Sequence, residues 1–313
     1  REQIEQASAL RRAIGHRALA WAEECADLIL HGQPLRGVRR ARWLTADRLL
    51  LGRLRARLGG RLRFVISGGA ALPVNVARFF WAAAIPVYEG YGLTETSPVL
   101  AVNRPGRVRL GTVGPSIPGV ELRLAHDGEV LARGPNVMRG YWHNESDTDD
   151  VLRGEWFHTG DLGSIDGDGF LNITGRKKDI LVLSTGKNVA PQAIEEAIAQ
   201  SPYVARVIAV GDERPTIGLL IVPNFESIER WAANQGLATA NREELLASPE
   251  VRRLMRSEVT RLQARLATYE KARQFEFLHE DLTEENGLLT PTQKVRRKAV
   301  LERHGHLVDR LYE

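Results

Sequence analysis

The stretch RLRFVISGGAALPVNVARFFWAAAIPVYEGYGLTETS, residues 61–97, decides the fold that we predict for this chain. Within it, residues 64–66 predict a short buried strand that ends at the turn Gly68-Gly69. Residues 73–84 predict a helix with a proline in its first turn, and residues 86–88 begin another strand. A strand–helix–strand unit of this kind is typical of a parallel sheet, in which ligands bind beyond the carboxyl ends of the strands.

Upstream of this unit, apolar residues recur at steps of three or four positions, which predicts one helix over residues 4–28. Gly32 and Pro34 are expected to end this helix, and its single apolar stripe requires a packing partner. The residues of the stripe are Ile4, Ala7, Ile14, Ala18, Trp21, Cys25 and Leu28.

Downstream, the alternating pattern of residues 120–124 and the turn at 126–128 predict a small antiparallel sheet or barrel that extends to about residue 175. A third region with both strands and helices begins near Lys178. Its strands are expected at 180–183, 204–210, 217–222 and 275–278, and its helices from Pro191, over 226–269 and from about Lys294.

The composition is that of a globular protein, because 43% of the 313 residues are hydrophobic and 26% are charged. Cys25 is the only cysteine in the sequence, which excludes an intramolecular disulfide and favours a reducing cytosol. The longest apolar stretch, residues 79–87, is far shorter than the about 20 residues that a membrane span requires. No signal peptide is recognisable, so we expect a cytoplasmic protein.

Ten arginines but only one acidic residue, Asp47, occur between Arg36 and Arg63. A basic stretch of this kind can meet anionic lipid or nucleic acid. Of these two we favour peripheral contact with the inner face of the membrane, and we expect no nucleic acid partner. A solvated surface, or a contact with a part of the protein that this sequence does not include, would give the same composition.

The motif YGLTETS, residues 91–97, places hydroxyl groups and a carboxylate in a turn after a predicted strand. Hard oxygen ligands such as those of Thr94 and Glu95 suit Mg²⁺ and phosphate. The same residues could also form a capping box at the start of a helix. The glycines at 90 and 92 favour a binding role, because they let the backbone approach a ligand closely.

Two further motifs carry charged groups that suit a nucleotide. In WFHTGDLG, residues 156–163, Asp161 lies in a predicted turn flanked by glycine, where it could accept hydrogen bonds from ribose hydroxyls or form an Asx-turn. In TGRKKDI, residues 174–180, Arg176 suits phosphate or ribose oxygens but could also belong to an exposed basic turn.

A last motif, LTPTQKVRRKAV, covers residues 289–300 and contains Lys294 after a short turn with a proline. A lysine can act as a point charge that stabilises negative charge on a transferring phosphoryl group. We interpret the neighbouring Arg296, Arg297 and Lys298 as the solvated face of a helix.

In their order and spacing, SGGA, YGLTET, WFHTGD, GRKKD and the late lysine resemble the adenylate-forming enzymes, which include acyl-CoA synthetases, luciferases and peptide-synthetase adenylation domains. The closer resemblance is to the carboxy-terminal half of bacterial long-chain fatty acyl-CoA synthetases, and it extends from about Arg11 to Tyr312. It rests on GRLRFVISGGAALP, EGYGLTETSPV, GTVGPSIPGVE, RGPNVMRGYW, STGKNVAP, LIVPNFESIERWA and LTPTQKVRRK.

The resemblance implies an α/β fold in three parts. Residues 1–108 would be the remnant of a parallel-sheet nucleotide-binding domain, residues 109–177 a β-barrel-like subdomain, and residues 178–313 a smaller, mobile α+β lid domain. It also implies the reaction, in which a carboxylate and MgATP form acyl-AMP and pyrophosphate, and the thiol of coenzyme A then expels AMP. Fatty acid, ATP and coenzyme A would be substrates, and Mg²⁺ would be the cofactor.

The same resemblance implies a role for each motif residue. Thr94 and Glu95 would contact ATP phosphate and Mg²⁺, with Glu95 as the metal ligand. Lys294 would act at the α-phosphate, and Lys178 would be the hinge of the lid. The remaining nucleotide residues would be Gly68, Gly69, Ala70, Tyr91, Gly92, Asp161 and Arg176, and the loop of the thioester step would be Gly186, Lys187 and Asn188.

The sequence departs from the family in one respect. Whole members carry, upstream of these motifs, a phosphate loop that is rich in Ser, Thr and Gly and ends in Pro-Lys-Gly, and this sequence contains no such loop. We therefore expect that an amino-terminal half is required for the full site, and that apolar surface is exposed where that half would pack.

Two alternatives remain open at the level of the sequence. The chain could belong to a related ligase that makes acyl-AMP for a carrier protein or activates an aryl acid, although the long segment 226–269 favours the long-chain type. It could also be a non-catalytic remnant that binds nucleotide, or a partner through its arginine stretch.

Overall fold

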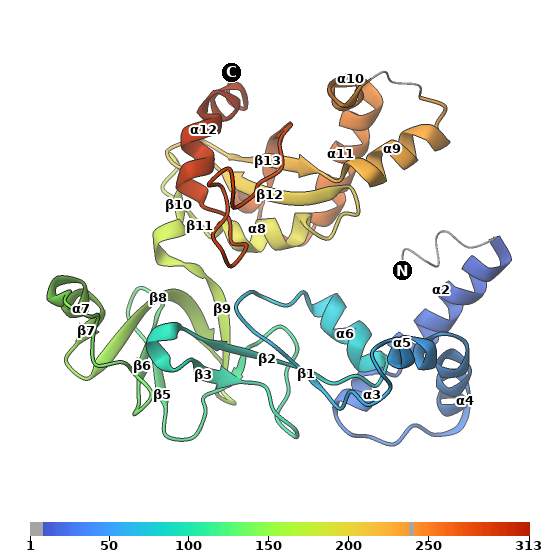
Figure 1. Cartoon of the computed structure of the whole chain (residues 1–313), viewed down its shortest axis with the longest axis horizontal. Helices are drawn as coiled ribbons and strands as arrows, with labels where there is room; N and C mark the ends of the chain where they lie inside the picture. The colour runs from blue at the N-terminus through green and yellow to red at the C-terminus, as the bar shows by residue number, and fades with distance from the viewer. Residues whose placement is uncertain (1–8, 238–240) are drawn as a thin grey trace. The chain divides into compact units, whose positions relative to one another are not determined.

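The structure, a computed structural model, describes residues 9–237 and 241–313 and divides into two compact units, Arg1–Ile173 and Thr174–Glu313 (Figure 1). The first unit combines helices with two sheets, and the second is built around a three-stranded sheet. The division falls inside strand β9 (Phe170–Arg176), shortly before Lys178. The mixed α/β class predicted from the sequence is confirmed.

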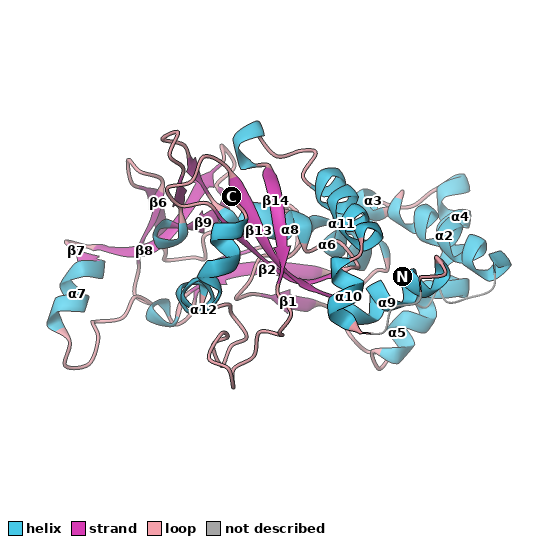
Figure 2. Ribbon diagram, turned by 90° about the horizontal axis from the view of Figure 1, so that it is seen from above, coloured by secondary structure: helices cyan, strands magenta, loops and turns pink. Residues whose placement is uncertain are grey.

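Helices make up the first part of the first unit (Figure 2): α2 (Ala9–Glu23), α3 (Ala26–Leu30), α4 (Gly37–Ala46), the π-helical turn η1 (Asp47–Leu51) and α5 (Gly52–Arg57). The single helix predicted over 4–28 is wrong, because a tight turn, in which the Cys25 N–H donates to the Ala22 carbonyl, separates α2 from α3. The predicted residues 4–8 lie outside the described residues. Ala18 and Cys25 of the predicted stripe are buried, whereas Ile14 is exposed.

The predicted strand–helix–strand unit is confirmed as β1 (Val65–Ser67), α6 (Val74–Ala82) and β2 (Val87–Gly92). Strands β1 and β2 are parallel, and β3 (Val99–Val102) pairs with β2 in antiparallel orientation. Helix α6 packs on the preceding helices through a small apolar cluster, and the Trp43 indole N–H donates to the Ala82 carbonyl at 2.9 Å. Strand β1 is the edge of this sheet, and its Ile66 is 65% exposed.

A curled antiparallel sheet follows, as the alternating pattern after residue 111 predicts (Figure 1). Its strands run in the order β4-β9-β8-β6-β5, and β7 pairs with the first two residues of β8. The helix α7 (Glu145–Val151) precedes β7. The strands besides β9 are β4 (Gly114–Pro115), β5 (Glu121–Leu124), β6 (Glu129–Arg133), β7 (Leu152–Arg153) and β8 (Trp156–Ile165).

The second unit begins with a short hairpin of β10 (Leu181–Val182) and β11 (Asn188–Val189). Its main sheet has the order β12-β13-β14, in which β13 is antiparallel to β12 and parallel to β14. Strands β12 (Val204–Val210) and β13 (Ile217–Pro223) lie where the sequence predicts them, and β14 (Ala272–Phe277) begins three residues before the strand expected at 275–278. The helices are α8 (Pro191–Ile198), α9 (Phe225–Asn234), α10 (Arg242–Ala247), α11 (Pro249–Leu262) and α12 (Arg297–Arg310).

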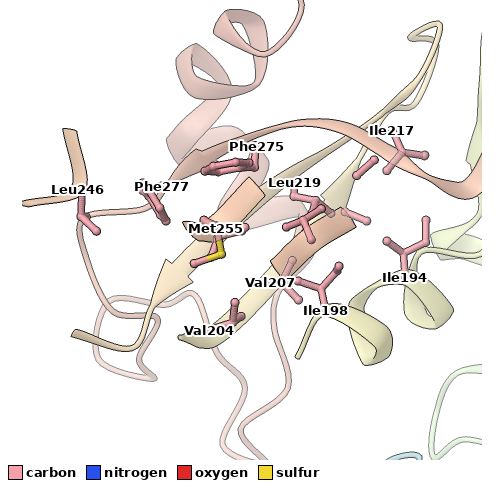
Figure 3. Close-up of a cluster of buried hydrophobic side chains, with 14 of the residues drawn as sticks. Ile194, Ile198, Val204, Val207, Ile217, Leu219, Leu246, Met255, Phe275 and Phe277 are labelled. Atoms are coloured by element: carbon pink, nitrogen blue, oxygen red, sulfur yellow. The ribbon is translucent and has the colours of Figure 1, made fainter. Parts of the chain in front are cut away.

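Every residue of β13 is buried, because helices cover both faces of the sheet. On one face, Leu219 packs among Ile194 and Ile198 of α8 and Met255 of α11 (Figure 3). On the other face, alternate residues of the same strands pack against α12. The period-2 alternation of a strand explains how one apolar run supplies two separate cores.

The long helical stretch expected over 226–269 consists of three helices, α9, α10 and α11. Each begins at a polar residue whose side-chain oxygen accepts a hydrogen bond from a backbone N–H inside the helix, and such caps set helix starts. Asn224 caps α9, Asn241 caps α10 and Ser248 caps α11, with donor–acceptor distances of 3.2, 2.8 and 3.3 Å. Within the described residues, no helix is both long and apolar enough to span a membrane.

Candidate active site

Asp161 lies in strand β8 of the first unit and is only 5% exposed. The turn predicted at this position is wrong. The strand instead continues through an irregularity in its pairing with β6, and Gly160 adopts a φ of 71°, which glycine reaches without steric penalty. Such bulges change the direction in which a strand presents its side chains. The glycine before Asp161 is therefore explained by the bulge.

The Asp161 carboxylate receives a hydrogen bond from the other predicted nucleotide motif. The Tyr91 hydroxyl at the end of β2 donates to Asp161 Oδ2 at 2.6 Å. The backbone is held as well, because the Asp161 N–H donates to Thr159 Oγ1 at 3.1 Å, and the Thr159 hydroxyl donates to the Val130 carbonyl at 2.7 Å. The structure thus brings YGLTET and WFHTGD together at Tyr91 and Asp161.

A second buried carboxylate, Glu129, supports this bulge and was missed by the sequence analysis. Its Oε1 accepts the Gly160 N–H at 2.9 Å, and its Oε2 lies 3.2 Å from His158 Nδ1. An acid directly before the apolar run of β6 was the available signal. We infer that Glu129 fixes the backbone next to Asp161, because it binds that backbone directly.

Gly92 has a structural reason of its own. A Cβ at this position would come within 1.7 Å of the Pro98 carbonyl oxygen, so no other residue fits. This contact closes the loop 93–97, since the Leu93 N–H donates to the same carbonyl at 3.0 Å. The Pro98 carbonyl therefore requires a glycine at position 92, independently of any ligand.

In the loop after β2, the capping role and the ligand-binding role that we considered for residues 94–96 fall to different threonines. Thr96 is fully buried and caps the turn η2 (Thr94–Thr96), because its Oγ1 accepts the Leu93 N–H at 3.0 Å. Thr94, in contrast, is exposed. The capping role thus belongs to Thr96, which leaves the Thr94 hydroxyl at the surface.

The Glu95 side chain is oriented by Tyr141, whose hydroxyl donates to Glu95 Oε1 at 2.9 Å. Burial, and then the hydrogen bond to Glu95, raise the pKa of Tyr141, so the phenol keeps the proton that it donates. The backbone is held too, since the Met138 N–H donates to the Glu95 carbonyl at 2.8 Å. Tyr141 lies in RGPNVMRGYW, a motif that carried no predicted site residue.

The glycine-rich turn after β1 is exposed at Gly68, Gly69 and Ala70. Gly69 has a φ of 82°, which explains a glycine there. The buried Glu89 of β2 holds the end of the turn, because its Oε1 accepts the Leu72 N–H at 2.9 Å. This turn therefore lies at the carboxyl end of β1, as predicted.

The first unit also contains a cleft of about 660 Å³ away from the motif residues. Two of the arginines that line it are paired with carboxylates, because Arg78 lies 2.6 Å from Asp27 and Arg109 lies 2.6 Å from Asp168. No predicted nucleotide residue lines this cleft. Its geometry therefore does not indicate a site for the nucleotide.

In the second unit, Lys294 lies in a tight loop between Leu289 and Val295, which form an isolated bridge. The Thr290 N–H donates to the Lys294 carbonyl at 2.8 Å, and the Lys294 N–H donates to Thr290 Oγ1 at 3.1 Å. Gln293 has a φ of 62°, an uncommon conformation for a residue other than glycine. The backbone is thus firmly held, while the Lys294 side chain is exposed.

The predicted loop of the thioester step joins β10 to β11 in the second unit. Gly186 has a φ of 77°, and its N–H donates to the Leu183 carbonyl at 2.8 Å. The Lys187 ammonium lies 5.9 Å from the centre of the Tyr269 ring, which is a cation–π distance. Lys187 and Asn188 are exposed and can meet a substrate.

Arg176 ends strand β9, and Lys178 lies in the following turn η3 (Lys177–Asp179). Both side chains are exposed. Lys178 lies five residues beyond Ile173, the last residue of the first unit. The chain segment that joins the two units therefore includes both predicted residues.

The comparison with known families agrees with this pairing of motifs. Residues 24–142 match the AMP-binding enzyme family, and residues 178–313 match the AMP-binding enzyme C-terminal domain. The chain belongs to the AMP-binding enzyme family. Tyr91 and Glu95 fall in the first matched range, and Lys294 falls in the second.

Among its relatives, the chain is similar to the long-chain-fatty-acid–CoA ligase FadD15 of Mycobacterium tuberculosis. The two are 41% identical over 296 residues, which cover 94% of this chain and 48% of the relative. The chain thus spans about half the length of the curated relatives that it matches.

Two solved structures are similar in fold. The adenylation domain of a carboxylate reductase from Mycobacterium chelonae matches with a TM-score of 0.69 and 22% identity, over 94% of this chain and 45% of that one. The anthranilate CoA ligase AuaEII, solved with anthranoyl-AMP, matches with a TM-score of 0.59 and 26% identity, over 77% of this chain and 44% of that one.

Proposed function

We propose that this chain is the carboxy-terminal part of an AMP-forming long-chain fatty acid–CoA ligase. The enzyme joins a fatty acid to AMP with release of pyrophosphate, and then transfers the acyl group to coenzyme A with release of AMP. The observation that carries the proposal is the hydrogen bond of 2.6 Å between Tyr91 and the buried Asp161, which unites two motifs of the family. The identity of 41% to FadD15 supports the long-chain type.

In this proposal the first unit binds the nucleotide. Asp161 accepts hydrogen bonds from the ribose hydroxyls, and its two side-chain oxygens have enough lone pairs to accept them together with the Tyr91 hydroxyl. Arg176, which ends strand β9 just beyond the division at Ile173, also faces the nucleotide as a cation. Adenine lies against the backbone and side chains of Gly68, Gly69, Ala70, Tyr91 and Gly92.

The triphosphate is assigned to the loop after β2. The Thr94 hydroxyl donates to a phosphate oxygen, and Glu95, oriented by Tyr141, is a ligand of Mg²⁺. Among the described residues, no three His, Cys, Asp or Glu side chains gather closely enough to hold a metal by themselves. The single carboxylate of Glu95 suits Mg²⁺, which proteins often bind through one or two carboxylates together with substrate phosphates. When bound, the ion neutralises phosphate charge.

The second unit supplies the group that acts on the reacting phosphate. The Lys294 ammonium offsets the negative charge that develops on the α-phosphoryl oxygens when the carboxylate attacks. Lys178 is the hinge at which this unit turns between the two half-reactions, and such lid motions gate many enzymes. Gly186, Lys187 and Asn188 then serve the thioester step, in which the coenzyme A thiol attacks the acyl carbonyl.

The proposal also includes the domain boundaries of the chain. We propose three parts, namely residues 1–108 from the parallel-sheet nucleotide-binding domain, residues 109–177 as a β-barrel-like subdomain, and residues 178–313 as a mobile lid. The phosphate loop and most of the fatty-acyl site would belong to an amino-terminal half. Exposed apolar residues between Val38 and Val76, such as Ile66 of the edge strand β1, support a contact with that half.

Peripheral contact with the inner face of the membrane, for a cytoplasmic enzyme, is also proposed. Arg36, Arg40, Leu44 and Arg48 follow one another at steps of four along α4 and η1, and all are exposed. Within the described residues, no carboxylate forms a salt bridge with these three arginines. Binding to vesicles with anionic lipid that weakens in Arg40→Glu would support this contact, whereas equal binding to neutral vesicles would contradict it.

The nucleotide assignment is tested by titrating AMP into the chain and following the heat. AMP is the suitable probe, because it lacks the phosphates that the absent phosphate loop would hold. Saturable binding that Asp161→Ala abolishes supports the proposal, and binding that this variant leaves unchanged refutes it. With an amino-terminal half supplied as a separate chain, release of pyrophosphate with palmitate but not with benzoate distinguishes the long-chain type from an aryl-acid ligase.

A further inference from the structure

We infer that Glu195 and Arg297 form a clamp that positions Lys294 for the first half-reaction. This inference rests on the proposed role of Lys294. The sequence suggested that Arg297 belongs to a solvated helix face, and the structure contradicts this, because the Arg297 and Glu195 side chains are only 20% and 23% exposed. Both are positioning residues, since neither is proposed to touch the substrate.

The clamp joins three elements of the second unit. Arg297, the first residue of α12, donates one guanidinium N–H to the Ala209 carbonyl of β12 at 2.5 Å and another to Glu195 Oε1. The Ala209 N–H donates to the same Glu195 oxygen at 2.8 Å, and Glu195 belongs to α8. Helix α12 is thereby tied at its start to both α8 and β12.

The loop that contains Lys294 has a second contact with strand β12. Arg206 of β12 approaches the Gln293 carbonyl with its guanidinium at 3.4 Å, which is a weak contact. On the other side, the Arg296 N–H donates to the Leu288 carbonyl at 2.9 Å. The loop therefore has attachments before and after Lys294, and the clamp at Arg297 is the strongest of them.

The clamp differs from an ordinary surface pair on the same helix. Lys298 and Glu302 lie 3.8 Å apart with side chains 91% and 67% exposed, and pairs of this kind contribute little. A partly buried arginine that donates to two different acceptors, here Glu195 and the Ala209 carbonyl, fixes geometry as well as charge. Because Arg297 is only three residues beyond Lys294, a shift at the start of α12 is passed to the loop.

The first experiment measures hydrogen exchange in the chain alone, so it does not depend on catalysis. Arg297→Met is expected to accelerate exchange of the Gln293, Lys294 and Arg296 amides about tenfold or more, since loss of a partly buried charged contact releases the loop. Arg303→Met is the matched control, because Arg303 pairs with Glu280 at 2.9 Å further along α12. Equal exchange in the wild type and Arg297→Met, or equal acceleration in the control, would overturn the inference.

The milder Arg297→Lys keeps the test decisive if Arg297→Met does not fold. A lysine retains the charge but cannot reproduce the fork that reaches both Glu195 and the Ala209 carbonyl. Faster exchange at the same three amides is expected, with unchanged exchange in β13. Exchange as slow as in the wild type would contradict the clamp.

The second experiment separates the two half-reactions, with the amino-terminal half supplied as a separate chain. Arg297→Met is expected to slow ATP–pyrophosphate exchange about 10- to 100-fold, because displacements near 1 Å cost this much in rate. In Arg297→Met, the rate of thioester formation from synthetic acyl-AMP should stay unchanged. In the control Arg303→Met, the rates of both reactions should stay unchanged. If Lys294→Ala abolishes pyrophosphate exchange but Arg297→Met leaves it at the wild-type rate, the clamp inference alone fails. If Lys294→Ala has no effect, the proposed function fails.

Discussion

The carboxylate assigned to the ribose and the ammonium assigned to the reacting phosphate are held in opposite ways. Asp161 has a buried side chain that receives the Tyr91 hydroxyl, and its strand is fixed by Glu129. Lys294 has a backbone that is bonded on both sides, yet its side chain extends into solvent. The first arrangement suits a group that holds the same ligand throughout, and the second suits a group that acts in only one of two steps.

The largest effect is expected from Lys294→Ala. Loss of one group that stabilises charge in the transition state typically lowers the rate about 10²- to 10³-fold. We expect this loss in ATP–pyrophosphate exchange with the amino-terminal half supplied, and no loss in thioester formation from acyl-AMP. Equal losses in both reactions would show that Lys294 has no special role in the first step, which would break the comparison.

The next effect is expected from Asp161→Asn, which removes the charge but keeps the shape. Hydrogen bonds to a charged group contribute about 1.5–3 kcal/mol each, so AMP affinity should fall about 10- to 100-fold in a calorimetric titration. Asp179→Asn, in the turn η3, is the control for loss of one negative charge. If both variants bind AMP with equal affinity, the assignment of Asp161 to the ribose is contradicted.

A smaller effect is expected from Tyr91→Phe, which leaves the Asp161 carboxylate without one donor. The free energy of unfolding of the first unit should fall by about 1–2 kcal/mol, as measured by denaturant titration. Tyr88→Phe is a matched control on the same strand, because no described residue forms a hydrogen bond with the Tyr88 hydroxyl. Equal stabilities of the two variants would show that the Tyr91 bond does not hold the site.

The smallest effect is expected on the stability of the second unit, from the carboxylate of Glu258, which lies outside the candidate site. Burial raises the pKa of Glu258, but hydrogen bonds from Arg261 and Ser201 outweigh it and lower the pKa below the ordinary 4.5. A lowered folded-state pKa stabilises the protein above the unfolded value and ceases to do so as pH falls through the folded value.

Glu258→Gln should therefore reduce the free energy of unfolding by about 1 kcal/mol or less at neutral pH. The difference from the wild type should shrink as pH falls below 4.5, which denaturant titrations at several pH values can follow. Exposed Glu243→Gln serves as the control for removal of one surface carboxylate from the same unit. A difference that does not change with pH would contradict the assigned cause.

The sequence predicted β12 and β13 well, because each is rich in branched apolar residues and lies between turns. The bulge at Asp161 could not be predicted, since flanking glycines are equally typical of a turn. Glu129 and Tyr141 were missed because a single polar residue does not reveal which distant group it contacts. Arg297 was misinterpreted for the same reason, because its partner Glu195 lies 102 residues earlier in the chain.

The most direct test of the division between the two units compares the wild type, Asp161→Asn and Lys294→Ala in one pair of assays, AMP titration and pyrophosphate exchange. We predict that Asp161→Asn loses AMP affinity, whereas Lys294→Ala binds AMP like the wild type and fails only in pyrophosphate exchange. If Lys294→Ala lost AMP affinity as severely as Asp161→Asn, or if Asp161→Asn bound AMP normally, the assignment of nucleotide binding to one unit and phosphate chemistry to the other would be contradicted.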